Sequence, residues 1–147
     1  MNLKKMAVLL LTANCLCSAF CTTAFAETND TLAVSDSISP AYELAEAVKA
    51  DLLIENTTAY CTSYARGDGV TRITVTQTLQ KYWGLWIWTG VDGAEWSKTV
   101  NDSTIILSST KSGLDSGTYR VMSVFKLTNK NGKTETVTVY SSEKTIA

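Results

Sequence analysis

Two alternating stretches, Thr118-Tyr-Arg-Val-Met-Ser-Val-Phe-Lys-Leu127 and Thr134-Glu-Thr-Val-Thr-Val-Tyr-Ser141, decide the fold class of this chain, and Asn131-Gly132 lies between them. Apart from Ser123, apolar residues return at every second position in both, which is the spacing of a strand with one buried face. Asn-Gly between two such runs is a strong hairpin signal. We therefore predict an antiparallel hairpin. Its predicted inward residues are Tyr119, Val121, Phe125, Leu127, Val137 and Val139.

The same texture of Thr, Val, Ile and Tyr, broken by Gly, Asn and Asp, extends upstream as far as Thr57. Residues of the first kind favour strands, and those of the second favour the turns between them. The predicted strands are Thr57–Ala65, Val70–Tyr82, Leu85–Thr89, Glu95–Val100, Ser103–Ser109, Thr118–Leu127 and Thr134–Ser141. Arg66-Gly-Asp-Gly69 is predicted to turn the first pair. Seven short strands joined by turns are typical of an antiparallel β-sandwich, here over residues 57–147.

The most specific local signal is Leu114-Asp-Ser-Gly-Thr-Tyr119-Arg-Val121. Its spacing, Asp115-x-Gly117-x-Tyr119, resembles the tyrosine corner of immunoglobulin-like sandwiches, in which the Tyr hydroxyl bonds to nearby backbone where the chain crosses between sheets. An antibody domain has a cysteine two residues later, where this chain has Val121. The resemblance implies an immunoglobulin-like antiparallel β-sandwich and carries no information about activity.

A second resemblance covers roughly residues 57–145. Its pattern is Thr78-Leu-Gln-Lys-Tyr82, then spaced Trp86, Trp88 and Trp96, then Ser116-Gly-Thr-Tyr-Arg-Val121, then Glu135-Thr-x-Thr-x-Tyr140-Ser141. This pattern is similar to small, mostly β exported proteins of Gram-positive bacteria whose function is undefined. The resemblance implies export and a β fold, and it transfers no catalytic or binding residue.

The first 26 residues have the pattern of an export signal. Met1–Lys5 is a short basic start, Met6–Cys21 is almost entirely apolar or small, and Ala24-Phe-Ala26 supplies the small-x-small pattern that signal peptidase cuts after. The alternative, a lipid-modified cysteine, needs a Leu-small-small-Cys run, which is missing from this segment. We expect a signal peptide over 1–26 cleaved after Ala26, a flexible lead-in over 27–39, and a secreted protein.

Removing 26 of the 147 residues leaves 121, enough for one domain with a core. Lys4 and Lys5 leave with the signal, so 11 of the 13 basic residues remain against 14 acidic ones, and neither nucleic acid nor stable membrane insertion is expected. Cys61 is then the last cysteine, which excludes an internal disulfide, and the chain contains no His. Since His activates most Ser and Cys nucleophiles and is the commonest metal ligand, we expect no catalytic residue, metal or cofactor.

Residues 40–53 are predicted to form one short amphipathic helix before the sandwich. Ser39 is a suitable N-cap, and Pro40 fits the first helical position, where no backbone N–H is needed. The apolar residues of the predicted stripe, at three- and four-residue spacing, are Ala41, Leu44, Ala45, Val48 and Leu52.

Trp83-Gly-Leu-Trp-Ile-Trp88 is the stretch that most strongly indicates function. In a strand, Trp86 and Trp88 point to one face while Leu85 and Ile87 point to the other, where they would fill the core. Two outward indoles suit the apolar faces of sugar rings or a proline-rich peptide. The alternative is that the tryptophans fill the core. The candidate ligand-binding residues are Trp86, Trp88 and Trp96.

Three other features have both a functional and an ordinary interpretation. Arg66-Gly67-Asp68 is an adhesion-type tripeptide, but Gly and Asp are also what a turn requires. Asp92 and Glu95 form a carboxylate pair suited to glycoside hydrolysis, and two acids in a loop are also common. Cys61 lies within a predicted strand and is expected to be a small buried apolar residue.

The sequence therefore predicts a secreted, non-catalytic binding or interaction module. Its expected partner is an extracellular ligand, either a glycan such as cell wall or a protein surface. The alternatives are a small extracellular hydrolase that uses carboxylates and a secreted structural or antagonistic protein.

Overall fold

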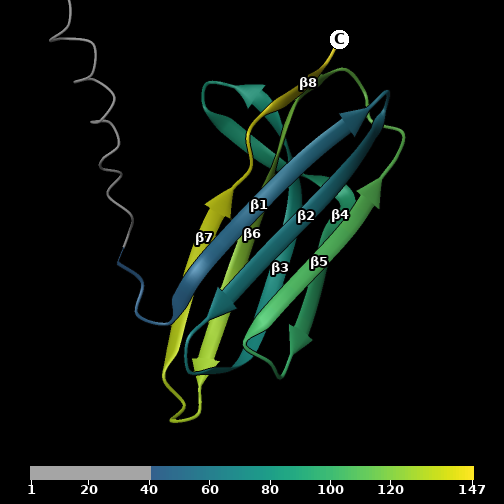
Figure 1. Ribbon diagram of the computed structural model, residues 1–147. Helices are drawn as coiled ribbons and strands as arrows, with labels where there is room; N and C mark the ends of the chain where they lie inside the picture. The colour runs from purple at the N-terminus through teal and green to yellow at the C-terminus, as the bar shows by residue number, and fades with distance from the viewer. Residues whose placement is uncertain (1–40) are drawn as a thin grey trace, which may run out of the picture. The chain divides into compact units, whose positions relative to one another are not determined.

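The computed structural model describes residues 41–147, which form a β-sandwich-like domain (Figure 1). The strands are β1 (Ala45–Glu55), β2 (Thr58–Gly67), β3 (Val70–Gly84), β4 (Ile87–Val100), β5 (Thr104–Lys111), β6 (Gly117–Asn129), β7 (Thr134–Tyr140) and β8 (Lys144–Ile146). The expected signal peptide, the lead-in and Pro40 lie outside the described residues. No helix occurs among the described residues, so none in that part of the chain is long and apolar enough to cross a membrane.

The strands form two antiparallel sheets, which confirms the predicted all-β sandwich class. The three-stranded sheet has the order β1-β2-β5, and the five-stranded sheet has the order β4-β3-β6-β7. The short strand β8 pairs with the beginning of β6, beyond the end of β7. Residues from both sheets share two buried apolar clusters, so the core lies between the sheets.

A buried polar layer separates the two apolar clusters. The first cluster includes Ile73, Val75, Phe125, Leu127 and Val137, and the second includes Cys61, Leu79, Leu114, Tyr119 and Val121. Between them the hydroxyls of Ser63 and Ser123 share a hydrogen bond of 2.7 Å, and the Gln77 side-chain amide donates to Ser63. Because buried polar groups are costly without partners, these hydrogen bonds favour the register that forms them, and among the side chains of the described residues Gln77 Oε1 alone is buried without a partner.

The predicted hairpin at the carboxyl end is confirmed, and Tyr119 makes a hydrogen bond of the kind expected there. β6 and β7 pair antiparallel, and the predicted inward residues are buried or pack against the core. The Tyr119 hydroxyl donates to the Asp115 carbonyl oxygen at 2.8 Å, where the chain passes from β5 in one sheet to β6 in the other. In the connection between β6 and β7, the Gly132 N–H donates to the Asn129 carbonyl oxygen at 3.0 Å and Gly132 has a positive φ of 83°, as in a type I turn followed by a left-handed residue.

The predicted helix over 40–53 is wrong, because Ala45–Glu55 is strand β1. Its apolar residues also fit a period of two from Val48 to Ile54, so the segment carries both periodicities. Long-range contacts select the strand. β1 pairs with β2 along its whole length, and the Glu135 carboxylate accepts the backbone N–H groups of residues 43–45 at 2.8–2.9 Å.

Two predicted connections are also wrong. Leu85–Thr89 and Glu95–Val100 are not separate strands, since Ile87–Val100 is the single irregular strand β4. Arg66-Gly-Asp-Gly69 is not a hairpin turn, because β2 and β3 belong to different sheets. Gly67 is buried there, and a Cβ on it would lie 2.5 Å from the Leu44 carbonyl oxygen. The glycine of this tripeptide therefore serves a close backbone approach.

Candidate functional site

β3 and β4 are joined by a two-residue turn made of bulky apolar residues. Gly84 pairs with Ile87, so Leu85 and Trp86 form the turn, with φ of 50° and 62°. Turns of this kind usually contain Asn, Asp or Gly, because other side chains clash with the backbone in the left-handed region. The side chains of Leu85 and Trp86 are 80% and 86% exposed. We call Leu85, Trp86 and Ile87 the tip.

The tip differs from the predicted arrangement of this stretch. One of the two predicted arrangements placed Leu85 and Ile87 in the core, but both are exposed, since the chain reverses at Leu85 and Trp86, where the predicted strand Leu85–Thr89 begins. The end of the β3–β4 hairpin reaches the end of the domain at which β8 and the C-terminus lie (Figure 1). Trp86 therefore stands in solvent at the turn and does not belong to a sheet face.

Trp88 lies on the outer face of the five-stranded sheet, within a row of aromatic side chains. Its ring is tilted by 47° against that of Tyr82, with centroids 5.1 Å apart. The Arg120 guanidinium lies 4.1 Å from the Trp88 ring centroid and 4.2 Å from that of Tyr140. Arg120 also donates to Gln80 at 2.8 Å. These cation–π contacts hold Trp88 within the sheet.

Trp96 lies on the opposite face of the sheet from Trp88. It pairs with the fully buried Gln77 and packs, partly buried, against the second apolar cluster. The structure thus places Trp86 at a turn, Trp88 on the outer face and Trp96 towards the core. The three predicted ligand-binding residues do not form one surface.

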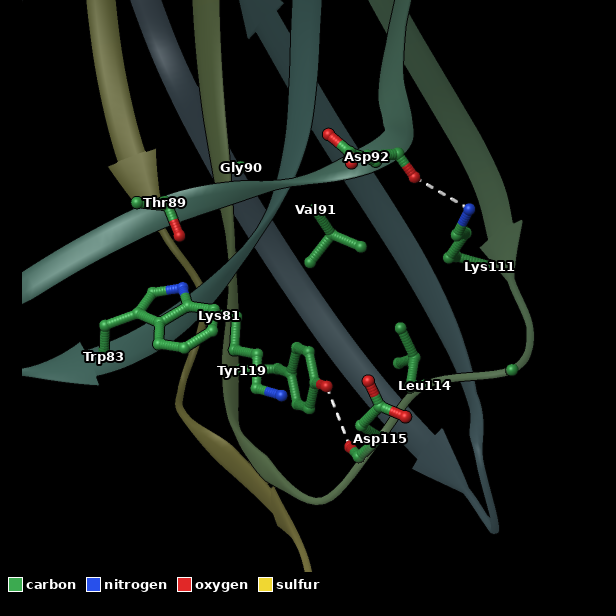
Figure 2. A pocket seen from close by; sticks show the side chains of 11 residues that line it. Lys81, Trp83, Thr89, Gly90, Val91, Asp92, Lys111, Leu114, Asp115 and Tyr119 are labelled. Atoms are coloured by element: carbon green, nitrogen blue, oxygen red, sulfur yellow. Dashed lines mark hydrogen bonds between the residues drawn. The ribbon is translucent and has the colours of Figure 1, made fainter.

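A pocket of about 320 Å³ lies beside the half of the β3–β4 hairpin that is nearest its turn, on the inner side of the five-stranded sheet (Figure 2). Its apolar surface comes from Val91, Leu114 and Tyr119. The Trp83 indole, 68% exposed, supplies one side of the pocket. The lining joins β3, β4, the end of β5 and the beginning of β6, so no single segment of the chain forms it.

Charged groups of both signs line this pocket. The Lys81 ammonium lies 5.6 Å from the ring centroids of both Trp83 and Tyr119. On the other side, the Lys111 ammonium donates to the Asp92 carbonyl oxygen at 2.8 Å, as Figure 2 shows. Asp92 and Asp115 are also lining residues, and Asp92 contributes its backbone carbonyl oxygen. The pocket therefore offers donors, acceptors and a flat apolar wall together.

The two carboxylates of the hydrolase interpretation have different surroundings. Asp92 is one of the residues that line the pocket, whereas Glu95 is not one of them, pairs with Thr78 and accepts its hydroxyl at 3.4 Å. Burial raises the pKa of the Cys61 thiol to about 12, so the reactive thiolate is scarce at neutral pH. Among residues 41–147, no group of three or more Cys, Asp or Glu side chains is placed to hold a metal ion.

Trp83 and Lys81, which line the pocket, are not among the binding residues predicted from the sequence. Gly84, which interrupts the alternation directly after Trp83, was the available sign that the chain turns there. Lys81 had no sign of its own, because its aromatic neighbour Tyr119 lies on a distant segment. In comparisons with known proteins, no family model matches the chain, and no curated protein matches it.

Proposed function

We propose that this protein is a secreted, non-catalytic binding module of immunoglobulin-like topology, and that the tip is its contact with a protein partner. The sheet order supports the topology, because the first, second and fifth strands form one sheet and the third, sixth and seventh lie together in the other. The tyrosine at the start of β6 agrees with it. The export pattern of residues 1–26 supports secretion.

The observation that carries the proposed function is the strained, exposed pair Leu85 and Trp86. A left-handed conformation costs a residue other than glycine about 1–2 kcal/mol. Side chains that are 80% and 86% exposed recover little of that cost by burial in the domain. Backbone strain of this kind is concentrated at functional sites, where binding supplies the missing contacts.

The chemistry of the tip favours a protein recess over a sugar. Between Trp83 and Trp88 the chain carries no charged side chain and no hydroxyl or amide side chain, so little is available for sugar hydroxyls. The turn is also convex, whereas sugar rings stack on flat aromatic surfaces. Full burial of a Leu or Trp side chain contributes about 1.5–3 kcal/mol, and interfaces are commonly dominated by a few such residues.

The test compares three immobilised proteins: the wild type, Leu85→Asn/Trp86→Gly and Ile106→Asn. The double variant supplies the residues that the turn conformation favours, and Ile106 is a matched exposed apolar residue on β5, 53% exposed. We expect the wild type and Ile106→Asn to retain the same extracellular protein, and the double variant to lose at least about tenfold in affinity. Retention by the double variant contradicts the proposal. So does tip-dependent binding to protein-free lipid vesicles.

A further inference from the structure

The pocket beside the β3–β4 hairpin has the features of a small-ligand site, and we propose that it binds a sugar ring that carries a carboxylate. This site is distinct from the tip, so the inference does not depend on the partner proposed above. It rests on the shape of the pocket, on one positioned ammonium group and on the other polar groups of the lining (Figure 2).

The shape and surface of the pocket suit one ring-sized ligand. Its volume of about 320 Å³ is at the lower end of the range for ligand sites. The floor is apolar and largely buried, since Leu114 is 6% and Tyr119 1% exposed. The Trp83 indole stands at the side as a flat, solvent-accessible wall. A sugar ring presents an apolar C–H face that packs on such a wall and hydroxyl groups at its edge.

The ammonium group of Lys81 is positioned for a carboxylate. It lies at 5.6 Å from the centroids of two aromatic rings, Trp83 and Tyr119. None of the ion pairs among residues 41–147 includes Lys81. Gly117 leaves room for its stem, because a Cβ at that position would lie 2.6 Å from the Lys81 Cε. A ligand carboxylate at this point would gain a charge-assisted hydrogen bond in partly dry surroundings.

The other polar groups of the lining favour a hydroxylated ring over an aromatic acid. Asp115 supplies a carboxylate acceptor and Lys111 an ammonium donor. Ring hydroxyls can donate to the carboxylate and accept from the ammonium group. An aromatic acid has no groups for these partners, and it would remove them from water without compensation.

The proposal is tested by two-dimensional NMR titration of the protein with D-glucuronate, D-glucose and benzoate. The indole N–H signals of the 4 tryptophans are separate probes, assigned by single Trp→Phe variants. We expect glucuronate to shift the Trp83 signal with a Kd on the order of 1 mM, a usual strength for so small a ligand. The Trp86 signal, at the tip, should stay in place. Glucose should bind about tenfold more weakly, since it lacks the partner of Lys81.

Three variants separate the contributions. Lys81→Met keeps the apolar stem but removes the charge, so glucuronate should bind this variant only as weakly as glucose does. Trp83→Ala should abolish the binding of both sugars. Leu85→Asn/Trp86→Gly should bind as the wild type does, and unchanged amide dispersion confirms that each variant is folded. The proposal is overturned if glucuronate does not shift the Trp83 signal of the wild type, if glucose binds equally well, or if benzoate binds more tightly than glucuronate.

Discussion

The two hairpins of the five-stranded sheet both reverse the chain through left-handed residues, but one turn contains polar residues and glycine and the other contains large apolar residues. Between β6 and β7, the Asn129 side-chain oxygen accepts the backbone N–H groups of Asn131 and Lys133, and Gly132 takes the left-handed position. Between β3 and β4, Leu85 and Trp86 occupy left-handed positions. The one side-chain bond within that turn is a 3.3 Å contact from the Trp86 N–H to the Tyr82 hydroxyl.

The comparison shows that the residues of the β6–β7 turn stabilise it locally and that those of the β3–β4 turn do not. The β6–β7 turn is polar, and its residues are those that stabilise it locally. The β3–β4 turn exposes two large apolar side chains and adopts a conformation that they disfavour. A turn that is unfavourable by itself indicates a contribution from a partner outside the domain.

The largest expected effect is a gain of stability when the β3–β4 turn is given ordinary turn residues. Leu85→Asn/Trp86→Gly should raise the free energy of unfolding by about 2 kcal/mol, because left-handed strain is relieved at two positions and little burial is lost. Urea unfolding of wild type and variant measures the change. The control Ile106→Asn should show no such gain. A loss of stability in the double variant would mean that the tip packs for folding, and the contrast between the hairpins would disappear.

Substitution of the buried aromatic residue Tyr119 should lower the stability of the domain, whereas substitution of Trp86 should raise it. Tyr119→Phe removes the hydroxyl that donates to the Asp115 carbonyl oxygen, and it should lower the free energy of unfolding by about 1.5 kcal/mol. Tyr60→Phe is the matched control, since Tyr60 is 41% exposed, and its effect should be close to zero. Equal effects of the two substitutions in urea unfolding would show that the corner bond does not stabilise the domain.

Gly132 also has a left-handed backbone conformation, and a substitution there should change the free energy of unfolding in the opposite direction. Gly132→Ala should cost about 1 kcal/mol, and the cost is conformational, because an added Cβ there meets no atom within 4 Å. Trp86→Gly alone should gain a similar amount. Thermal unfolding measures the change in stability of both variants, with Lys130→Ala as an exposed control. If both substitutions stabilised the domain or both destabilised it, the comparison of the two hairpins would be contradicted.

The sequence predicts those parts of the fold whose local signals agree with their long-range contacts. The β6–β7 hairpin has alternation on both sides and suitable turn residues, and the Tyr119 corner has its partner four residues away. β1 was misjudged because its apolar residues fit two periods, and its pairing with β2 decides between them. A short-range pattern cannot contain that information.

The candidate site was less predictable than the fold for two physical reasons. The tip has none of the residues that turns of this kind prefer, so the sequence predicts Leu85 and Trp86 as part of a strand. The pocket is assembled from segments that are far apart in sequence, with Lys81 meeting Tyr119 through the pairing of β3 with β6. The composition of the Trp-rich stretch indicated where to look, but the side on which each indole lies required the structure.

The smallest expected effect concerns the anchoring of β1 to the β6–β7 hairpin. Burial alone would raise the pKa of Glu135, but the backbone N–H groups of residues 43–45 and the charge of Lys133 outweigh it and lower that pKa. A lowered pKa in the folded state means that the anchor stabilises the domain above the ordinary glutamate value of about 4.3 and is lost as the pH falls through the folded value.

Hydrogen exchange should therefore show protection of the residue 43–45 amides at neutral pH and a loss of that protection in acid, before the domain unfolds. Glu135→Gln keeps a hydrogen-bond acceptor without the charge, so protection in this variant should be weaker at neutral pH and should no longer depend on pH in this range. Protection that persists in acid in the wild type would show that the pairing of β1 with β2 is sufficient. Glu135 of the β6–β7 hairpin would then not be needed to anchor β1. The two hairpins would differ only in the residues of their turns.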